Sequence, residues 1–274
     1  MQAIAKIEQT GLQRARGTID LALVDGKLER FYQSGSAKIF MPKTYAQTIE
    51  AVLVNTAGGL TGGDKFEAKL AAEGATHLTV STQTAERVYR AIGPQTAKTR
   101  VDMKLTEFAS LHWLPQETIL FDCAGFSRQL NVEMDEDSSF FASEMMVFGR
   151  TAMQETVKQG NISDQWRIIR GGKLIHAEAL RLNGSIEHKL ARQASADGNI
   201  CFANTLYVSC DAEAKADAVF GFFNNFADVQ TAVSAWDGKL VIRNLCGNTA
   251  RLKKLMIQFI GQFRNIANPR VWND

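Results

Sequence analysis

The stretch that decides the fold begins at Asn55 and reads NTAGGLTGGDKFEAKL (residues 55–70). Two glycine pairs, at 58–59 and 62–63, lead the chain into Asp64. Glycine adopts positive φ and lets backbones approach closely, so this spacing specifies one particular loop between two strand-like segments. The loop ends in a carboxylate, which indicates either a tight turn in which Asp64 accepts hydrogen bonds from its own backbone or a polar site.

The glycine loop does not match either common nucleotide-binding motif. A phosphate-binding loop needs a lysine and a hydroxyl residue directly after its last glycine, whereas Asp64 follows here and would repel phosphate. No helical pattern follows the loop, so the dinucleotide fingerprint fails as well. The loop therefore gives no support to nucleotide binding.

Period-two alternation of apolar and polar residues dominates the chain up to about residue 210. Each such segment predicts a half-buried strand with one solvated face, and turn signals separate further strands. The clearest alternating segments are 66–70, 77–81, 101–105 and 130–134, with turn signals at 25–26, 171–172 and 197–198. The pattern predicts a mainly β fold.

Two apolar stripes at helical spacing interrupt the β pattern, at 213–229 and 251–263, with a predicted strand at 239–246 between them. Asn248 or Thr249 is the expected N-cap of the second helix. The chain thus divides into a strand-rich part (1–210) and a helix–strand–helix part (211–265). No internal repeat or linker separates them, so we predict one continuous domain over residues 1–274.

The helical stripes either dock on the sheets or serve a partner protein. Docking on the sheets is the preferred alternative, and the adjacent aromatics Phe222 and Phe223 keep the second one open, because two neighbouring residues do not share one helix face. The partner-binding candidates are Phe222, Phe223, Phe226, Leu252, Leu255 and Phe259.

Composition excludes several classes of protein. The 274 residues carry 31 basic and 29 acidic side chains, a net charge of +2, which gives no bulk attraction to nucleic acid. The first residues lack the apolar core of a signal peptide, and no segment is apolar for long enough to cross a membrane. We therefore expect a cytoplasmic protein. Its 4 cysteines form no C-x-x-C pair, so a thiolate metal cluster has little support.

His176 and Glu178 are the first candidates for metal chemistry. In the segment LIHAEALRL (174–182), an extended conformation places both side chains on one face, about 7 Å apart. Neutral imidazole and carboxylate together suit a borderline divalent metal. Two ligands on one strand make only a weak site, and a histidine hydrogen-bonded within a polar cluster is the structural alternative.

Glu144 interrupts the apolar run FFASEMMVFG (140–149). A carboxylate in such a run is expensive to bury unless it is paired, bound to a cation or facing water, so it indicates a hydrated polar interior. Carboxylate pairs also permit hydrolysis, with Asp64 beside Glu86 or Glu117 as candidates. No nucleophile motif is present. A β-rich binding module without a metal role is a third possibility.

Six blocks of this chain, in order, resemble the family of urease accessory proteins called UreD (UreH in some bacteria). They cover the chain from about residue 50 to its end. The blocks are NTAGGLTGGD (55–64), STQTAERVYR (81–90), WLPQETILFD (113–122), SEMMVFGR (143–150), WRIIRGGKLIHAEALRL (166–182) and NPRVW (268–272). One departure is Cys123, which stands where the family pattern has a glycine.

The resemblance implies a non-enzymatic maturation factor for the nickel enzyme urease. Such a factor binds apo-urease and UreF, which recruits the GTPase UreG, and the assembly guides nickel to the urease active site. The implied fold is a helically wound arrangement of layered β-sheets with a small helical portion. No tightly bound cofactor is expected, only nickel in passage. The expected path or weak metal residues are Asp64, Glu86, Glu144, His176 and Glu178.

Overall fold

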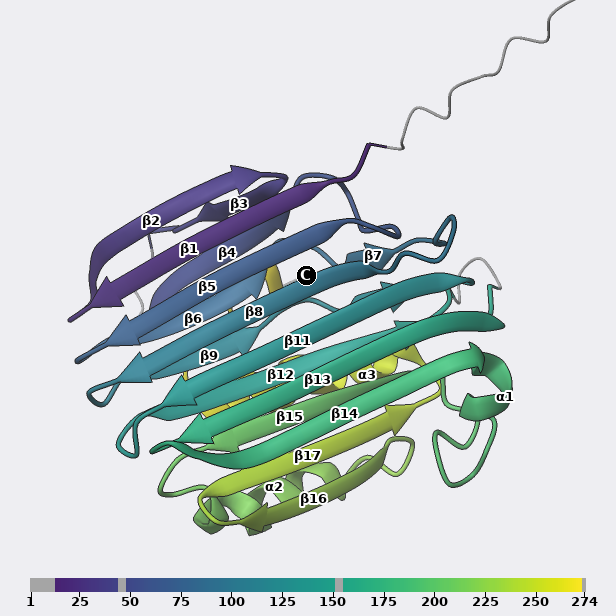
Figure 1. The fold of residues 1–274 in the computed structure, drawn as a ribbon. Coiled ribbons are helices and arrows are strands. Elements are labelled where there is room, and N and C mark those ends of the chain that lie inside the picture. The colour runs from purple at the N-terminus through teal and green to yellow at the C-terminus, as the bar shows by residue number, and fades with distance from the viewer. Residues whose placement is uncertain (1–12, 44–47, 151–154, 273–274) are drawn as a thin grey trace, which may run out of the picture.

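The computed structural model describes residues 13–43, 48–150 and 155–272, and within them the alternating segments form strands of two stacked sheets (Figure 1). We call the seven-stranded sheet the outer sheet. Its described strands lie in the order β14 (Lys173–Ser185), β13 (Gln159–Arg170), β11 (Ala124–Met134), β8 (Ala97–Thr106), β5 (Lys65–Glu73), β1 (Arg16–Val24) and β2 (Lys27–Gly35).

We call the second sheet the central sheet, because it lies between the outer sheet and a layer of helices (Figure 1). Eight of its ten described strands lie in the order β16 (Gln230–Trp236), β17 (Lys239–Cys246), β15 (Cys201–Val208), β12 (Ser139–Phe148), β9 (Ser110–Leu114), β6 (His77–Thr82), β4 (Ile49–Asn55) and β3 (Ala37–Phe40). The short strand β10 (Thr118–Leu120) pairs with β12 and with β7 (Glu86–Val88).

The chain winds by alternating between the two sheets. It passes from β4 in the central sheet to β5 in the outer sheet, then to β6, β8, β9, β11, β12 and β13, changing sheet at each step. Successive strands within each sheet are parallel neighbours, as in β5–β8–β11 and β6–β9–β12. The layered, helically wound β fold implied by the resemblance is therefore confirmed.

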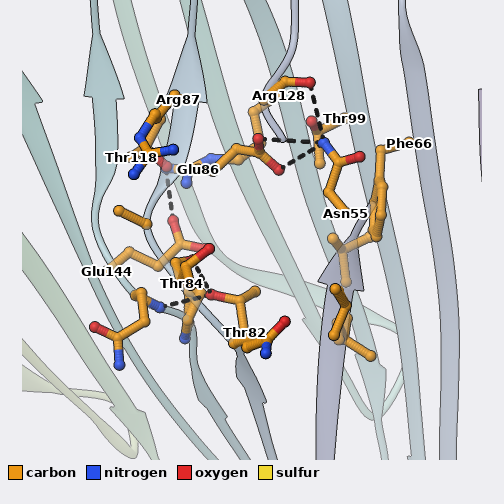
Figure 2. A pocket seen from close by; sticks show the side chains of 18 of the residues that line it. Asn55, Phe66, Thr82, Thr84, Glu86, Arg87, Thr99, Thr118, Arg128 and Glu144 are labelled. Carbon is orange, nitrogen blue, oxygen red and sulfur yellow. Dashed lines mark hydrogen bonds and ion pairs between the residues drawn. The ribbon is translucent and has the colours of Figure 1, made fainter. Parts of the chain in front are cut away.

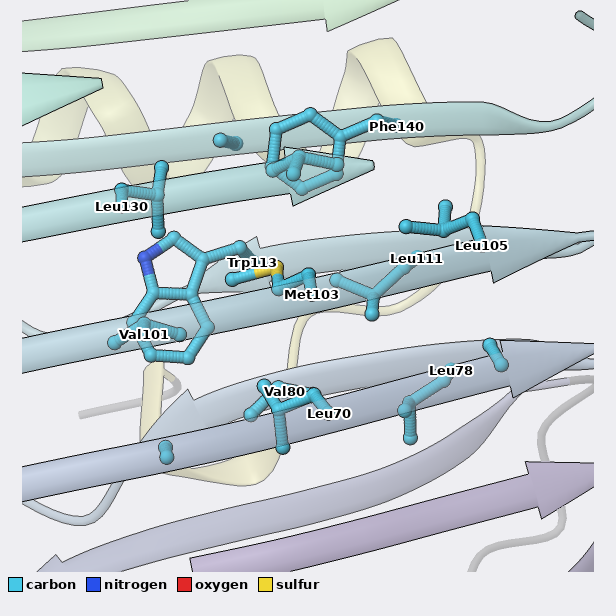
Figure 3. Close-up of a cluster of buried hydrophobic side chains, with 14 of the residues drawn as sticks. Leu70, Leu78, Val80, Val101, Met103, Leu105, Leu111, Trp113, Leu130 and Phe140 are labelled. Atoms are coloured by element: carbon cyan, nitrogen blue, oxygen red, sulfur yellow. The ribbon is translucent and has the colours of Figure 1, made fainter. Parts of the chain in front are cut away.

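The space between the sheets is filled by the inward faces of the alternating strands (Figure 3). Val101 and Leu130 of the outer sheet and Leu111 and Phe140 of the central sheet are at most 2% exposed. Burial of each such side chain contributes about 1.5–3 kcal/mol. Trp113 lies in the same cluster, but its indole N–H points to a polar neighbour described below.

The helical layer covers the other face of the central sheet. It consists of α2 (Ala216–Phe223) and α3 (Thr249–Arg264), with 3-10 turns η2 (Glu213–Lys215) and η3 (Arg270–Trp272), while α1 (Ile186–Leu190) caps the edge near β14. Asn248 is the N-cap of α3, since its side chain accepts a hydrogen bond from the Arg251 N–H at 2.9 Å. The first predicted helix is shorter than expected: it ends at Phe223 instead of reaching residue 229.

The helical layer covers the face of the segment 77–81 that the sequence predicts to be solvated. Thr79 and Ser81 are both 1% exposed, because β6 lies within the central sheet, which has a covered face on each side. Alternation of apolar and polar residues here separates two buried environments, one apolar and one polar.

Most of the apolar stripe residues of the helices are buried, so they do not form an exposed surface for a partner. Leu252, Leu255 and Phe259 are at most 2% exposed and pack on the central sheet, as the docking alternative predicts. Phe222 and Phe223 both contact Phe259, with ring centroids 5.4 and 4.8 Å apart, so these adjacent aromatics do pack together at the end of α2.

Phe223 is 3% exposed, and Phe226 is partly buried beside Phe222. Phe220, by contrast, is 56% exposed, although it belongs to the same predicted stripe. In this chain, therefore, none of the six partner-binding candidates forms an open apolar patch.

The described residues contain no helix that is long and apolar enough to span a membrane. Residues 1–12, on which the expectation of no signal peptide rested, lie outside the described part of the chain.

The glycine loop connects β4 of the central sheet to β5 of the outer sheet. Within it, the Leu60 N–H donates to the Arg87 carbonyl at 2.7 Å, and the Tyr89 N–H donates to the Leu60 carbonyl at 2.8 Å. Gly59 has a φ of 146°, and a Cβ atom there would lie 2.7 Å from the Arg87 carbonyl oxygen and 2.4 Å from the Tyr89 ring. The glycine allows this close approach of backbone to backbone.

We expect Gly59→Ala to lower the free energy of unfolding by about 2–4 kcal/mol, because it adds a clash to a strained φ. Gly58→Ala is the matched control. Gly58 also has a positive φ (74°), but a Cβ there meets nothing within 4 Å, so a loss of only about 1 kcal/mol is expected. Urea denaturation of both variants measures the difference, and equal losses would contradict the assigned contact.

Candidate functional site

A cavity of about 100 Å³ lies between the two sheets beside the glycine loop. Figure 2 shows polar side chains from both sheets around it, and Gly58 and Gly59 form part of its wall. The polar lining includes Asn55, Thr82, Glu86, Thr99, Thr118, Arg128 and Glu144. The Thr99 hydroxyl is buried without a hydrogen-bond partner among the described residues. The volume and the free polar group suit a few water molecules.

Glu86 enters this cavity from β7. The Asn55 side-chain amide lies 3.3 Å from each of its carboxylate oxygens and donates to them. Burial raises the pKa of Glu86 to about 7, against the opposing effect of this hydrogen bond. The carboxyl group therefore exchanges its proton near neutral pH.

Arg128, Glu144 and Asp164 form a buried ion triad that joins the two sheets. The Arg128 Nη2 atom lies 2.6 Å from Glu144 of the central sheet and 2.5 Å from Asp164 of the outer sheet. The Trp113 indole N–H donates to the other Glu144 oxygen at 2.5 Å. Burial raises the pKa of Glu144 to about 6 in spite of the nearby guanidinium. One cation balances two carboxylates, so the triad keeps a net negative charge when both are ionised.

A second polar cluster surrounds Glu178 at the inner side of β14. Its carboxylate lies 3.5 Å from the His176 Nε2 atom, accepts a hydrogen bond from the Asn204 amide at 3.0 Å and pairs with Arg243 at 3.3 Å. Burial by itself raises the pKa of the Glu178 carboxyl. The hydrogen bond from His176 and the charge of Arg243 lower this pKa by a larger amount, so it lies below its ordinary value. Asn204 and Arg243 belong to the central sheet, so this cluster also joins the two sheets.

The strand register places the two clusters next to each other. Glu144 lies opposite Asn204, and Asn204 lies opposite Arg243 across β12, β15 and β17. The clusters thus lie in one line of polar groups through the interior, which we call the polar seam. Its members are Glu86, Arg128, Glu144, Asp164, Asn204, Glu178 and Arg243.

The polar seam begins at the cavity by the glycine loop and ends at a larger hollow of about 550 Å³. That hollow lies where β14 and β16 form the edges of the two sheets, and Glu178, Asn204 and Arg243 line it together with apolar side chains. Polar groups therefore connect two hollows through an otherwise apolar core.

The Asp64 carboxylate is occupied by hydrogen bonds from backbone N–H groups at the glycine loop. One of its oxygens accepts a hydrogen bond from the Ala15 N–H and the other from the Thr61 N–H, both at 2.8 Å, and the residue is 5% exposed. The turn alternative from the sequence describes this geometry. Glu117, the other carboxylate named for hydrolysis, pairs with Lys253 of α3 at 3.1 Å. Neither carboxylate stands free beside Glu86.

The structure brings together some of the residues predicted from the sequence and separates others. Glu86 and Glu144 line one cavity, and His176 and Glu178 share a face as expected. Leu174, predicted on that same face, is 52% exposed because β14 carries a bulge that shifts the register between Leu174 and His176. No group of three or more metal-ligating side chains converges within the described residues.

Sequence reasoning missed Arg128, Asp164, Asn204 and Arg243. A signal for the first two was present: Arg128 alternates with Phe126 and Leu130, so period-two spacing already placed its charge on the buried face. Asp164 occupies the corresponding position between Ile162 and Trp166. Two opposite charges on buried faces predict an ion pair, which the register of β11 and β13 then supplies.

Comparison with known proteins identifies the family. A family model described as UreD urease accessory protein matches residues 13–273. The chain therefore belongs to the UreD family of urease accessory proteins, and the resemblance drawn from the sequence blocks is confirmed.

Several proteins named urease accessory protein UreD are similar over nearly the whole chain. One from Rhizobium leguminosarum bv. trifolii is 44% identical over 266 residues, covering 95% of this chain and 96% of that protein. One from Agrobacterium fabrum is 40% identical over 263 residues, covering 95% and 91%. One from Bradyrhizobium diazoefficiens is 40% identical over 263 residues, covering 94% of each.

Arg128→Met is expected to lower the free energy of unfolding by about 3–5 kcal/mol, because it leaves two buried carboxylates without their cation. The loss should be larger at pH 8 than at pH 5, where protonation relieves the repulsion. Arg167→Met, at an exposed position of the same sheet, should change the stability by less than about 0.5 kcal/mol. Denaturant unfolding at both pH values tests this, and a pH-independent loss would argue against the triad.

Glu86→Gln should stabilise the protein at high pH. A carboxyl whose folded-state pKa is raised from 4.5 to about 7 binds a proton more tightly in the folded state, so stability falls as pH rises through that window. The glutamine variant lacks this loss. It should therefore be about 1–3 kcal/mol more stable than the unaltered chain at pH 8 and about equal at pH 4. Glu133→Gln, at an exposed position, serves as the control, and parallel stability curves for all three proteins would refute the shifted pKa.

Proposed function

We propose that this chain is a urease maturation factor that binds apo-urease and a UreF–UreG complex in the cytoplasm and offers nickel a polar route. The observation that carries this proposal is the polar seam, which connects two hollows through an apolar core. A fold that needed only a stable core would gain little from buried charges, since well-packed apolar groups are often as stabilising as a buried ion network.

The donor set suits a cation in passage. Carboxylate and amide oxygens dominate the polar seam, and among the described residues no three metal-ligating side chains converge on one point. A site of this kind binds a divalent ion weakly and releases it readily, whereas a converged thiolate or histidine set would retain it. Nickel is the cargo in this proposal, and no resident cofactor is required.

The charge balance of the interior also favours a cation. Within the polar seam, Arg128 and Arg243 offset only part of the charge of Glu86, Glu144, Asp164 and Glu178. Glu86 can release its proton near neutral pH as a cation approaches, because its pKa is about 7. His176 adds an imidazole next to Glu178 at the far end.

The role is that of a scaffold and not of an enzyme. Catalysis by a carboxylate pair would need two acids free to face a substrate, and the candidates Asp64 and Glu117 are occupied by backbone N–H groups and by Lys253. The first test is urease produced with its complete accessory set, with and without this chain. Urease that stays abundant but loses its nickel in the absence of the chain supports the maturation role, and fully loaded urease overturns it.

The nickel route is tested separately with Glu86→Gln and Glu178→Gln. Each removes a charge from the polar seam, and we expect roughly tenfold slower nickel loading of urease under limiting nickel. Glu133→Gln, which removes an exposed charge from β11, should load urease at the normal rate. Metal analysis of purified urease gives the nickel content, and co-purification of the variants with urease and UreF shows whether the complex still forms. If complexes that contain the variants load urease with nickel at the normal rate, the nickel route is wrong, but the scaffold role is unaffected.

A further inference from the structure

The strands of the outer sheet lie side by side (Figure 1), and the side chains on its solvent-facing side form rows that run across these strands. Residues directly opposite each other in neighbouring strands share a row, since strand register places them on the same face. One row, near the starts of the parallel strands, combines basic residues and hydroxyls without any acid. We call it the cationic row, and its members are Arg16, Lys65, Lys98, Ser127, Ser163 and Arg181.

The other rows of this face are balanced in charge. The next row carries Glu67 beside Arg100. The row after it alternates Asp20, Lys69, Asp102, Asn131 and Arg167. Ion pairs join Asp20 to Arg30 at 2.8 Å and Asp102 to Arg100 at 2.7 Å. By contrast, none of the four cations of the cationic row makes an ion pair within the described part of the chain.

Three of these cations stand side by side on neighbouring strands with no acid between them. Neighbouring strands lie about 4.8 Å apart, and like charges directly opposite each other repel. Arg16, Lys65 and Lys98 stand in this relation on three successive strands, and all three are exposed. The glycine loop fixes these three strands in register. The Asp64 side chain accepts a hydrogen bond from the Ala15 N–H, and the Asp64 backbone carbonyl accepts one from the Lys98 N–H. These two hydrogen bonds connect β1, β5 and β8.

A hollow of about 330 Å³ lies beside the cationic row at the starts of β8, β11 and β13. Gln95, Asn161 and Asn183 line it with uncharged amide groups, and glycine backbone forms much of the remaining wall. Asn161 and Asn183 each stand two residues along the strand from a member of the cationic row, so hollow and row are adjacent on one face. Amide side chains of this kind can pair with the backbone of an extended peptide.

We propose that the cationic row and this hollow bind an acidic, extended segment of a partner protein. All six side chains of the row can donate hydrogen bonds to carboxylates. Five strand spacings of about 4.8 Å make a row about 24 Å long, which matches about seven residues of extended chain. The docking surface faces solvent and lies apart from the polar seam, so it goes beyond the nickel route proposed above.

Single-stranded nucleic acid fits this surface less well than an acidic peptide. Binding of single strands relies on aromatic side chains on which bases stack. The cationic row contains none, and the neighbouring row consists of Thr18, Glu67, Arg100, Gln129 and Gln165.

The test uses the full chain and a fluorescein-labelled decaglutamate peptide, with binding followed by fluorescence anisotropy at 50 and 150 mM NaCl. The triple variant Arg16→Gln/Lys65→Gln/Lys98→Gln should bind the peptide at least about tenfold more weakly. The matched control, Lys69→Gln/Lys104→Gln/Arg167→Gln, removes the same charge from the same face, where Lys69 stands opposite Asp102 and Lys104 opposite Glu133. It should bind within about twofold of the unaltered chain.

A second readout is the melting temperature. Relief of repulsion in the cationic row should leave the triple variant as stable as the unaltered chain or up to about 3 °C more stable. The single variant Lys98→Gln, which should weaken binding about threefold, provides the binding test if the triple variant fails to fold.

Three outcomes overturn the proposal: equal weakening by both triple variants, no binding of the peptide at 150 mM NaCl, or binding of decathymidylate as tight as that of the peptide. None of these measurements involves urease, so their failure is distinct from failure of the maturation role.

Discussion

The ionic contact between Arg128, Glu144 and Asp164 is the constraint on which the interior of this protein depends. A guanidinium from the outer sheet holds carboxylates from both sheets at 2.5–2.6 Å in a region that water reaches poorly. Breaking such a contact is far more costly than never having formed it, because the remaining charges stay buried. The spacing and register of the two sheets are therefore tied together by charge at this point and at the Glu178–Arg243 pair, whereas elsewhere apolar packing joins them.

The surrounding core makes this arrangement tolerable. One apolar cluster around Val101, Leu130 and Phe140 lies on one side of the triad, and another around Phe126, Met146 and Ile162 lies on the other. These clusters supply the favourable burial that offsets the cost of desolvating charges. The polar seam is thus a narrow line between two apolar regions, which is the arrangement expected where a polar function crosses a stable core.

The winding of the chain explains how residues far apart in sequence come to share this line. Each coil contributes one strand to each sheet, so a polar residue on the inward face of one coil stands next to the inward residue of the following coil. Glu86, Glu144 and Glu178 come from three different coils, and each is separated from the next by more than thirty residues. The same winding places Arg16, Lys65 and Lys98 in one row on the outer face.

Several features followed from the sequence alone because they are local. Strand alternation, the strand 239–246, the Asn248 N-cap and the shared face of His176 and Glu178 each depend on residues within a few positions of each other. Cys123 also fits this group: it adopts a φ of 61°, the conformation for which the family pattern has a glycine. The six ordered blocks identified the family, because their order along the chain is itself a sequence property.

Other features were decided only by tertiary structure. Period-two spacing shows which side chains share a face of a strand, but it does not show which strands are neighbours or whether they run parallel. The pairing of Arg128 with Asp164, the bulge that turns Leu174 outward and the burial of Phe223 and Phe259 all depend on that order. Composition and motif determined the family and the class of fold, while long-range strand register determined which charges meet.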